Sequence, residues 1–480
     1  MSREPTSPAV ARFRALAASP DESLREFFAP DRPVYSAAAP GRLDVMGGIA
    51  DYSGSLVLQL PINRHTVAML QLTHDANIEI VSIRDGVPSY LGADAHALLY
   101  GPLSDGDHLA EYFRHPNVDR WGAYVFGVLH ACLIRHAKSV HRPPSAFRLL
   151  IDSNVPEGKG VSSSAALEVA CCAAIAAAFE VTMSAEEVAK ACQWAENNVA
   201  GAPCGIMDQM SSACGMRDHL LQLRCQPARI EGQVAIPAGY RFFGIDSGIR
   251  HAVTGPGYAA VRTAAFMGYR IIASLAGLVA REDAGRVFIT DSRWEGYLAN
   301  IGVAEFEDRF RNALPEQMLG ADFLAQFQGI TDDVTRVDPE RWYPVRAAAE
   351  HPVRENSRVE RFAGLLTRTP SDDVARSMGA FMYESHDAYN TLQLGSDGTD
   401  LLVDLVRDAG LASGVFGAKI TGGGSGGTVA VLARSNAESV VRSIARRYEE
   451  LTGRAAQVFA GSGAGMAEQG VLLLHHASAI

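Results

Sequence analysis

Three short segments combine glycines, hydroxyls and charged side chains closely enough to do chemistry: residues 40–54, 156–166 and 421–428. The second reads PEGKGVSSSAA, so small residues stand where the backbone must turn tightly before a helix begins. A helix N-terminus offers unpaired N–H groups and a partial positive charge, both of which suit a phosphate group. Lys159 adds a mobile cation, and the three serines that follow could cap the helix or reach a metal ion. An ordinary strand–turn–helix junction with serine caps explains the same residues equally well.

The two familiar motifs in the third segment do not fit their surroundings. It contains G-x-G-x-x-G from Gly422 to Gly427 and G-x-S-x-G around Ser425. A Rossmann fingerprint and a nucleophile elbow both need a helix directly after the loop, whereas TVAVLA predicts a strand. A Walker A sequence is also missing from the chain. We therefore expect a loop between two strands, whose backbone a neighbouring phosphate can approach.

Charged residues in apolar or glycine-rich surroundings are the candidate catalytic and binding groups. Arg42, Asp44 and Asp51 lie in PGRLDVMGGIADYSG, a pattern that also fits a solvated loop. Glu196 borders the apolar stripe of a predicted helix, where an unpaired carboxylate is costly. It is either paired with an arginine or bound to a metal ion. Asp208 lies in CGIMDQM, an apolar context typical of an ion-paired acid or of one with a raised pKa.

Two α+β halves must position these segments. In the first half, SLVLQLPI, TVAMLQLT and IEIVSI alternate apolar and polar residues as strands do. The second half begins with a strand predicted over 240–245. We expect an N-terminal lobe over residues 1–235 and a C-terminal lobe over 236–480, which meet at a cleft. Residues 281–375 are charged and aromatic and are expected to form a helical insertion in the second lobe.

Hydrophobic periodicity predicts the main helices. An amphipathic helix is expected over 8–28, a second over 121–137, and a very apolar, buried one over 165–179. The sequence Ser184-Ala-Glu-Glu is a capping box that opens a helix to about residue 199. The last is expected over 436–452.

The composition excludes several classes of protein. The chain has 43 basic and 54 acidic residues and a net charge of −11, whereas nucleic-acid binders more often carry a basic excess. This acidic balance predicts that the chain has no nucleic-acid partner. The chain contains no run of about 18 apolar residues, so we expect no membrane span. The N-terminus lacks the apolar stretch of a signal peptide. The seven cysteines show neither Cys-x-x-Cys nor zinc spacing, so we expect reduced thiols and a cytoplasmic location.

Taken in order, the three segments resemble the three motifs of the GHMP small-molecule kinases, and within that superfamily the galactokinase branch. PGRLDVMGGIADYSG is similar to the sugar-binding signature, VPEGKGVSSSAALEVA to the phosphate loop and KITGGGSGGTVAVL to the third motif. WGAYVFGV, CQWAENNVAGAPCGIMDQ, DSGIRHAVTGPGY and MYESHDAYN add to the resemblance, which spans roughly residues 36–460. It implies a two-lobed α+β fold with the active site between the lobes. It also implies transfer of phosphate from ATP, with Mg²⁺, to the anomeric hydroxyl of a monosaccharide.

The resemblance implies a role for each matching residue. Asp208 would take or orient the proton of the anomeric hydroxyl, and Arg42 would pair with it and stabilise the transferring phosphate. Ser164 and Glu196 would bind Mg²⁺. Trp121 would lie beside adenine, although a core tryptophan is the alternative. The remaining expected contacts are Gly158, Lys159, Gly160, Ser162, Ser163 and Ser164 for ATP, Gly48, Ile49, Asp51, Gly205 and Tyr258 for the sugar, and Gly422, Gly423, Gly424 and Ser425 in the third loop.

One departure from the galactokinase pattern bears on the sugar. Galactokinases have Glu-His where this chain has Gly48-Ile49, and the resemblance implies that this pair lies around the C6 hydroxymethyl of galactose. L-Arabinopyranose has the same hydroxyl stereochemistry but lacks C6, so Gly-Ile favours arabinose. The string GRLDVMGGIADYSGSLVLQ and the insertion over 281–375 also resemble the kinase portion of plant L-arabinokinases. Restoring Glu-His is expected to shift the preference toward galactose. Space left by Gly48 would still admit C6 unless Ile49 or a neighbour fills it.

Other functions stay open at this point. Galactose or a further monosaccharide is the alternative substrate. A sugar sensor without turnover would need a broken site, yet the matching catalytic and metal-binding residues are all present. We expect a monosaccharide and ATP as the ligands, and a monomer or a homodimer.

Overall fold

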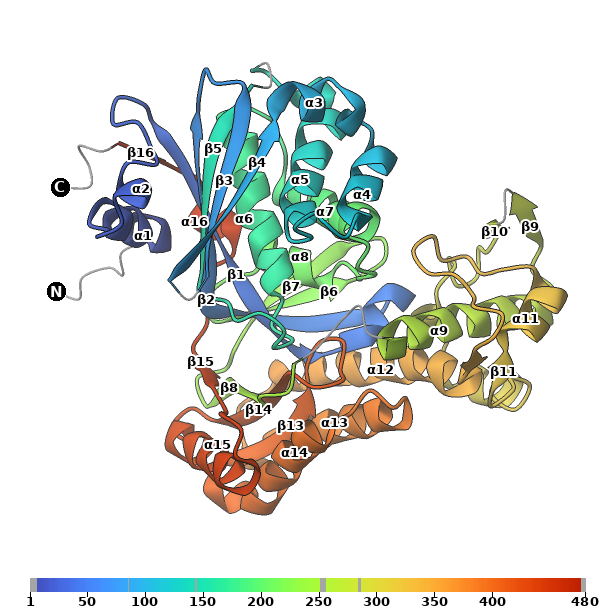
Figure 1. The fold of residues 1–480 in the computed structure, drawn as a ribbon. Coiled ribbons are helices and arrows are strands. Elements are labelled where there is room, and N and C mark those ends of the chain that lie inside the picture. Colours follow the sequence, from blue (N-terminus) through green and yellow to red (C-terminus); the bar gives the residue numbers. More distant parts are fainter. Residues whose placement is uncertain (1–6, 85, 143–144, 251–255, 284–285, 476–480) are drawn as a thin grey trace.

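Two β-sheets, each backed by helices, form the framework of the chain in a computed structural model (Figure 1). The structure describes residues 7–84, 86–142, 145–250, 256–283 and 286–475. The larger sheet lies in the upper part of Figure 1, and the smaller one lies among the orange and red helices below it. The predicted two-lobed α+β fold is therefore confirmed.

The larger sheet carries the first glycine segment on its longest strands. Its order is β16-β1-β2-β5-β3-β4, and β6 and β7 continue it beside β2. The antiparallel pairing of β1 with β2 shifts register between Pro40 and Arg42 and again between Asp44 and Met46. Such irregularities re-aim side chains, here those of Arg42 and Asp44. The strands are β1 (Val34–Met46), β2 (Leu56–Leu72), β3 (Asn77–Arg84), β4 (Val87–Asp94), β5 (Phe147–Ser153), β6 (His219–Arg224), β7 (Arg229–Ala235) and β16 (Leu472–Leu474).

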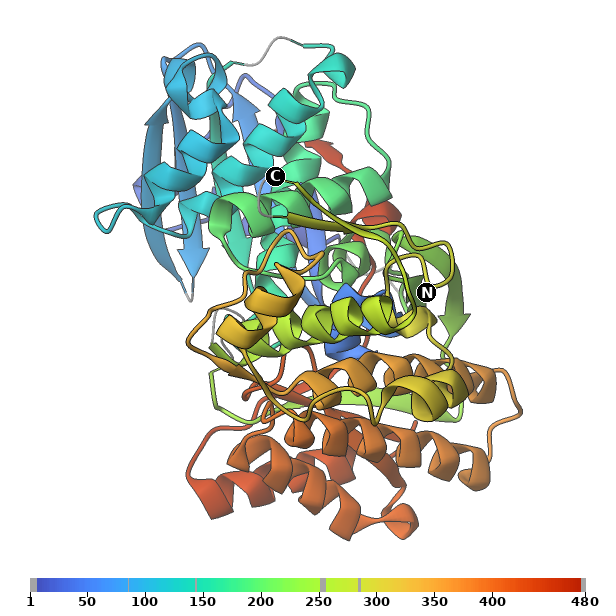
Figure 2. The same ribbon diagram turned by 90° about the vertical axis from the view of Figure 1, so that its right-hand side faces the viewer.

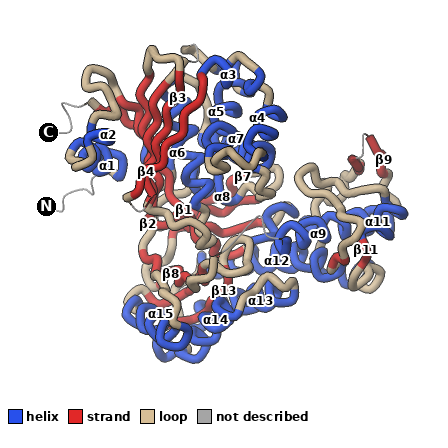
Figure 3. Tube along the Cα trace, in the orientation of Figure 1, coloured by secondary structure: helices blue, strands red, loops and turns tan. Residues whose placement is uncertain are grey.

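Helices cover both faces of this sheet (Figures 1 and 3). On one face lie α1 (Pro8–Ala17) and α2 (Glu22–Arg25), where a single helix was expected. The helix breaks because Pro20 cannot continue it, and the Asp21 carboxylate caps α2 through the amide of Ser23. On the other face lie α3 (Ala95–Leu99), α4 (Gly106–Arg114), α5 (Gly122–His130), α6 (Ser163–Ala178), α7 (Ala185–Ala195) and α8 (Met207–Cys214), with α16 (Met466–Gln469) near the chain end.

Two helices end earlier than the sequence predicts. α5 continues as a π-helical turn over Ala131–Arg135, and α7 continues as a π-helical turn over Glu196–Ala200. The expected capping box at Ser184 is present and begins α7. π-Helical turns are frequent at functional sites because they displace side chains from the regular helical positions, and here one begins at Glu196.

The smaller sheet has the order β13-β14-β8-β15. β8 begins five residues after the end of β7 and pairs antiparallel with both β14 and β15. The short strand β16 pairs with β1, so the last described strand returns to the larger sheet. The strands are β8 (Tyr240–Asp246), β13 (Val415–Ile420), β14 (Thr428–Arg434) and β15 (Val458–Ala460), and the helices are α9 (Pro256–Leu275), α12 (Val345–Leu366), α13 (Asp372–Thr391), α14 (Asp397–Ala409) and α15 (Glu438–Thr452). Figure 2 shows α9, in yellow-green, crossing between the two lobes.

The segment 281–375 is less helical than expected. It opens with the exposed hairpin β9 (Ala280–Asp283) and β10 (Arg286–Ile289), and its one long helix is α12. Between them, the aromatic rings of Trp294, Phe306 and Phe323 are buried in one core cluster with α9. These rings are held by packing on α9, so long regular helices are not needed to bury them. The short elements in between are α10 (Val303–Glu305), β11 (Met318–Leu319), α11 (Gly320–Phe327) and β12 (Trp342–Tyr343).

Among the helices of the described ranges, none combines the length and the apolar character needed to cross a membrane. All seven cysteines lie within these ranges and are free thiols.

Candidate active site

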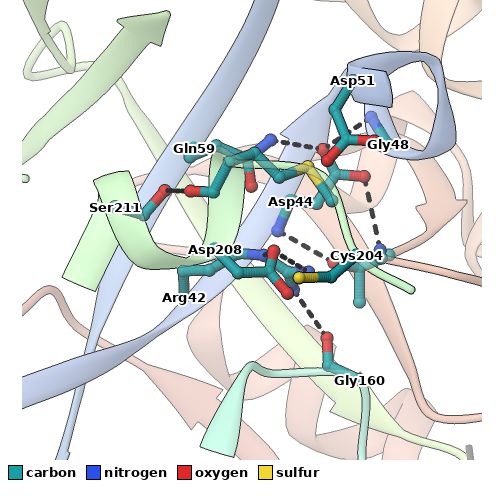
Figure 4. A network of polar contacts seen from close by, with 12 residues as sticks. Arg42, Asp44, Gly48, Asp51, Gln59, Gly160, Cys204, Asp208 and Ser211 are labelled. Atoms are coloured by element: carbon teal, nitrogen blue, oxygen red, sulfur yellow. Dashed lines mark hydrogen bonds and ion pairs between the residues drawn. The ribbon is translucent and has the colours of Figure 1, made fainter. Parts of the chain in front are cut away.

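Arg42 and Asp208 meet where the two lobes face each other (Figure 4). Arg42 extends from β1 beside its register shift, and Asp208 lies in the first turn of α8. Arg42 Nε donates to Asp208 Oδ1 (2.9 Å), and Nη1 donates to the carbonyl oxygen of Gly160 (2.7 Å). Arg42 Nη2 lies 2.7 Å from the same Asp208 oxygen as an ion pair. Arg42 is buried, whereas 22% of the Asp208 side chain is exposed. The Arg42 guanidinium therefore joins the solvent-accessible carboxylate of Asp208 to the second glycine segment.

A cavity of about 300 Å³ opens at this pair. It brings together most of the residues expected in the site: Arg42, Ile49, Asp51, Gly158, Gly160, Ser162, Ser163, Ser164, Glu196, Gly205, Asp208, Tyr258 and Gly423 line it, together with Tyr124, Ala202, Cys204 and Met207. Gly48, Lys159, Trp121, Gly422, Gly424 and Ser425 do not line this cavity.

The second glycine segment forms a tight cradle before α6. Gly158 (φ +67°) and Gly160 (φ +68°) adopt the left-handed backbone conformation that glycine tolerates best, and Ser162 (φ +59°) adopts it as well. Helix α6 begins at Ser163, which lines the cavity, so the unpaired amides of the first turn of α6 lie at the cavity. Ser162 Oγ is buried and has no hydrogen-bond partner within the described parts of the chain. Together these features fit an anionic ligand such as a phosphate group.

The ammonium group of Lys159 forms an ion pair outside the cavity. Its Nζ lies 2.7 Å from Oδ2 of the buried Asp246, at the end of β8, and its carbonyl oxygen accepts a hydrogen bond from Thr428 Oγ1 (2.7 Å). The residue thus links the two lobes behind the cradle. Trp121 also lies outside the cavity, half-buried just before α5, with the Arg84 guanidinium 5.6 Å from its ring centroid.

Four carboxylates surround the cavity or lie directly behind it. Burial and then the Asp208 charge raise the pKa of both Glu196 and Asp51 to about 7. Behind Glu196, burial followed by the Glu196 charge raises the pKa of Glu168 well above its ordinary value. The amide of Gln209 donates to Glu196 (2.6 Å) and to Glu168 (3.2 Å). This excess of buried acid favours a bound cation.

A magnesium ion fits this donor set. Ser164 and Glu196 both line the cavity beside the cradle, and the Ser164 hydroxyl lowers the pKa of Glu196 against the larger effect of burial. Mg²⁺ commonly takes one or two protein ligands and completes its shell with water and phosphate oxygens. Over the described ranges, no group of three or more His, Cys, Asp or Glu side chains could enclose a metal ion, so such a shared shell is the arrangement that these residues support.

A second wall of the cavity, formed by Asp51, Gly205 and Tyr258, is polar and closely packed. The Asp51 carboxylate accepts a hydrogen bond from the amide of Tyr52 (2.6 Å). A Cβ atom on Gly205 would lie 1.7 Å from Asp51, so only glycine allows the two segments to approach this closely. Tyr258 completes this wall and packs its ring edge-to-face on Tyr52. Of DSGIRHAVTGPGY, which precedes and includes Tyr258, residues 251–255 lie outside the described ranges.

Gly48 and Ile49 begin a 3-10 turn (Gly48–Ser53) at the edge of the cavity. Ile49 is buried and lines the cavity. Gly48 has φ +47°, and a Cβ there would lie 1.8 Å from the hydroxyl oxygen of Tyr389. The space that the sequence left open at Gly48 is therefore filled by a side chain of the other lobe.

The third glycine segment is a loop between β13 and β14, which confirms the predicted strand–loop–strand arrangement. Its turn uses left-handed conformations at Gly422 (φ +68°), Gly424 (φ +78°) and Ser425 (φ +61°). Gly423 reaches the cavity, while a Cβ on Gly422 would lie 3.0 Å from Nη2 of Arg42. The loop thus closes the cavity against the Arg42 side of the cradle.

Several residues of this region escaped the sequence analysis. Arg262 forms a buried bidentate pair with Asp332 (2.9 and 2.8 Å) and donates to the carbonyl oxygen of Cys204 (3.0 Å), which fixes the backbone beside Gly205. Asp332 is 70 residues from Arg262, so no local pattern could have joined them. Tyr124 lies one helical turn from Trp121 in WGAYVFGV, and that spacing is the signal that could have identified it.

Comparison with known families gives three matches. The description "GHMP kinases N terminal domain" matches residues 123–216, "GHMP kinases C terminal" matches 373–450, and "Galactokinase galactose-binding signature" matches 22–72.

Two curated relatives illustrate the likeness in sequence. The chain is 39% identical to an L-arabinokinase of Arabidopsis thaliana over 92% of this chain and 47% of that protein, so it spans about half the length of this relative. It is 29% identical to a galactokinase of Chloroflexus aggregans over 88% of this chain and 90% of that protein.

Solved structures show the same fold at low identity. The galactokinase of Lactococcus lactis, crystallised with galactose, superposes with a TM-score of 0.68 at 20% identity over 97% of this chain and 98% of that one. The mevalonate kinase of Methanococcus jannaschii superposes with a TM-score of 0.54 at 14% identity, over 89% and 98%.

Proposed function

This chain belongs to the GHMP kinases, and we propose that it is a sugar 1-kinase, which transfers the γ-phosphoryl group of ATP to the anomeric hydroxyl of a monosaccharide. The observation that carries the proposal is the Arg42–Asp208 pair, which joins a partly exposed carboxylate to a cradle suited to phosphate. Acceptor and donor would thus meet in one cavity of about 300 Å³.

The chemistry assigned to the pair is a direct phosphoryl transfer. Asp208 accepts the proton of the anomeric hydroxyl as the sugar oxygen bonds to the γ-phosphorus, and the bond from that phosphorus to the bridging oxygen of ADP breaks. Arg42 holds Asp208 in place and stabilises the negative charge on the transferring group. Since phosphoryl transfer depends mainly on positioning and electrostatics, these residues need no covalent intermediate.

The phosphates would lie in the cradle of the second glycine segment. The amides at the start of α6 and the Ser162 hydroxyl would bind phosphate oxygens, as would the backbone at Gly158 and Gly160. Ser164 and Glu196 would hold Mg²⁺, which when bound neutralises charge on the phosphates of ATP. Lys159 belongs to this proposal through the backbone of the cradle, because its ammonium group is paired with Asp246.

The sugar proposed is L-arabinose. Identity to the L-arabinokinase is 39%, against 29% to the galactokinase of Chloroflexus aggregans. Ile49 offers an apolar wall, which suits a pentopyranose better than a sugar that carries a further hydroxymethyl group. Asp51, Gly205 and Tyr258 would form the opposite side of the sugar site.

Galactose is the second candidate. The galactose-binding signature that matches residues 22–72 favours it, since this match includes Gly48, Ile49 and Asp51. A sugar sensor without turnover is not favoured, because the Arg42–Asp208 pair is intact. A cytoplasmic location and a monomeric or dimeric state remain part of the proposal.

A single assay tests these alternatives. The purified protein is given ATP, Mg²⁺ and each of a panel of monosaccharides, and ADP release is followed together with formation of the sugar 1-phosphate. Turnover with L-arabinose well above that with D-galactose supports the proposal. Sugar-stimulated ADP release with galactose alone would favour the second candidate, and binding without ADP release would favour the sensor.

A further inference from the structure

The hydroxyl of Tyr389 lies where a side chain at position 48 would begin. Tyr389 is fully buried in the last turn of α13, in the C-terminal lobe. Its Oη accepts a hydrogen bond from the amide of Ile49 (2.9 Å) and donates to the carbonyl oxygen of Gly422 (2.7 Å). One hydroxyl therefore ties the wall of the proposed sugar site to the third glycine loop.

The ring that carries this hydroxyl is held from two sides. His351 packs edge-to-face on it, with ring centroids 5.6 Å apart, and Lys419 Nζ lies 5.4 Å from its centroid. Burial, followed by the Asp44 charge, raises the pKa of Tyr389 well above its ordinary value, so the hydroxyl keeps the proton that it donates. With the ring fixed, the position of the hydroxyl is fixed as well.

The neighbouring backbone leaves no room for adjustment. Gly48 donates its amide to Asp44 Oδ1 (3.1 Å), and its φ of +47° already strains any residue other than glycine. A Cβ at this position would lie 1.8 Å from Tyr389 Oη and 3.0 Å from Cζ. Position 48 therefore cannot present a side chain to the cavity while Tyr389 stays in place.

We infer that Tyr389 is a specificity-determining positioning residue. Its hydroxyl excludes any side chain at position 48 and holds the backbone of Ile49, so that the apolar Ile49 side chain forms the wall of the sugar site. Tyr389 does not touch the sugar itself, because it does not line the cavity. The inference rests on the proposed function in that it takes Ile49 to face the sugar. It adds that a residue of the C-terminal lobe controls which sugar the N-terminal lobe accepts.

The first test replaces Tyr389 with Phe, which keeps the ring and removes both hydrogen bonds. We expect the sugar KM to rise by roughly fivefold or more, since two buried backbone groups lose their partner and Ile49 is released. We also expect the ratio of kcat/KM for arabinose to that for galactose to fall at least threefold. General damage to the fold or to ATP binding affects both sugars alike and cancels in this ratio.

Tyr240 provides a matched control. Its buried hydroxyl also bonds two backbone groups, donating to the carbonyl oxygen of Ser371 (2.8 Å) and accepting from its amide (2.7 Å). Tyr240 lies in β8 and does not line the cavity. Tyr240→Phe should lower the melting temperature but leave the sugar KM and the sugar ratio unchanged.

The second test is a double-mutant cycle with Gly48→Ala. In the unmodified protein the new methyl group collides with Tyr389 Oη, so we expect kcat/KM for the preferred sugar to fall by roughly tenfold or more. In the Tyr389→Phe background the colliding oxygen is gone while the strain of the positive φ remains, so the same change should cost at least threefold less than in the unmodified protein. If Gly48→Ala alone does not fold, Tyr389→Phe and the doubly changed protein still decide whether the Tyr389 hydroxyl excludes a side chain at position 48. A doubly changed protein that folds and keeps the kcat/KM of Tyr389→Phe to within about tenfold supports this role, and one that also fails to fold contradicts it.

The outcomes separate this inference from the proposed function. The preferred sugar of the unmodified enzyme tests the proposed function, and the variants test Tyr389 with whichever sugar that is. Equal costs of Gly48→Ala in both backgrounds, or an unchanged sugar ratio in Tyr389→Phe, would overturn the role of Tyr389 even if arabinose is the substrate.

Discussion

Lys419 Nζ lies 2.7 Å from Asp44 Oδ2, and both side chains are completely buried between the two lobes. Asp44 also accepts hydrogen bonds from Gln59 Nε2 (2.7 Å) and from the Gly48 amide (3.1 Å). Burial alone would raise the pKa of Asp44, but the Lys419 charge, followed by that of Arg42, lowers it below its ordinary value. Asp44 is therefore ionised, and its contact with Lys419 links β1 to β13 behind the site.

Breaking this pair should destabilise the protein strongly. Lys419→Met leaves the Asp44 carboxylate buried without its partner, and we expect a loss of about 3–5 kcal/mol in the free energy of unfolding. Urea denaturation at neutral pH measures this loss. The control is Arg434→Met, which breaks a partly exposed pair with Asp372 and should cost less than about 1 kcal/mol. Similar losses in the two variants would contradict a stabilising role for the buried pair.

Acid should affect the same pair in a defined direction. Because the pKa of Asp44 is lower in the folded protein than in the unfolded chain, its stabilising contribution is present above the unfolded value of about 3.9. This contribution is lost as the pH falls through the folded value. Without Lys419, burial is expected to raise the pKa of Asp44, so the cost of Lys419→Met should be smallest in acid, where the carboxylate is protonated, and should grow as the pH rises toward 8.

Asp51 should have the opposite effect on stability. Its pKa is raised to about 7, so the folded protein binds the proton more tightly than the unfolded chain does. As the pH rises from the unfolded value of about 3.9 through 7, the ligand-free protein should lose on the order of 2–4 kcal/mol from this group. Asp51→Asn should raise the melting temperature at pH 8 and leave it nearly unchanged at pH 4, while raising the sugar KM. A variant that gains no stability at pH 8 would show that Asp51 is ionised in the folded protein at little cost.

The sequence could identify most residues of the cavity but not the residues behind it. The cradle, the Asp208 turn and the strand–loop–strand unit follow local rules of turn chemistry and periodicity, so they could be predicted. Tyr389 and Gly48 are 341 positions apart, and only the packing of the lobes brings the hydroxyl to the missing side chain. Lys159 illustrates the same limit, because its position in the glycine segment suggests a phosphate ligand while its ammonium pairs with Asp246 in the other lobe.

Asp208→Asn should abolish transfer while sparing ATP binding. The amide keeps the shape of the side chain but cannot accept the proton of the sugar hydroxyl, and loss of a positioned base typically costs about 10²–10⁴-fold in turnover. Turnover is measured by ADP release and ATP affinity by calorimetry. Retention of more than a tenth of the turnover would remove Asp208 from the role proposed for it.

Glu196→Gln should raise the Mg²⁺ concentration needed for half-maximal rate, with the sugar KM little changed. The substitution removes the anionic oxygen that this hard cation prefers. Glu168→Gln is the matched control, because Glu168 shares the Gln209 donor with Glu196 but does not line the cavity. Equal Mg²⁺ titrations for the two variants and the unmodified enzyme would mean that Glu196 only fills the edge of an apolar stripe.

The last prediction concerns the sugar. If Ile49 faces the position that C6 of galactose would occupy, the extra hydroxyl is buried without a partner, at a cost of about 1–3 kcal/mol. The unmodified enzyme should then prefer arabinose over galactose by well over tenfold in kcat/KM. Exchanging Gly48-Ile49 for Glu-His should not by itself shift the preference toward galactose, contrary to the expectation from sequence, because a side chain at position 48 collides with Tyr389.

Adding Tyr389→Leu to the Glu-His exchange removes the hydroxyl from the space that the new glutamate needs. The triply changed enzyme should therefore shift its sugar ratio toward galactose, whereas the Glu-His exchange alone should mainly lose activity on both sugars. Full galactokinase activity is not expected, because the residues around positions 48 and 49 pack against Gly-Ile and would not hold the introduced Glu-His pair in a fixed orientation. Equal efficiency on arabinose and galactose in the unmodified enzyme would overturn the arabinose assignment and make galactokinase the better description of its activity.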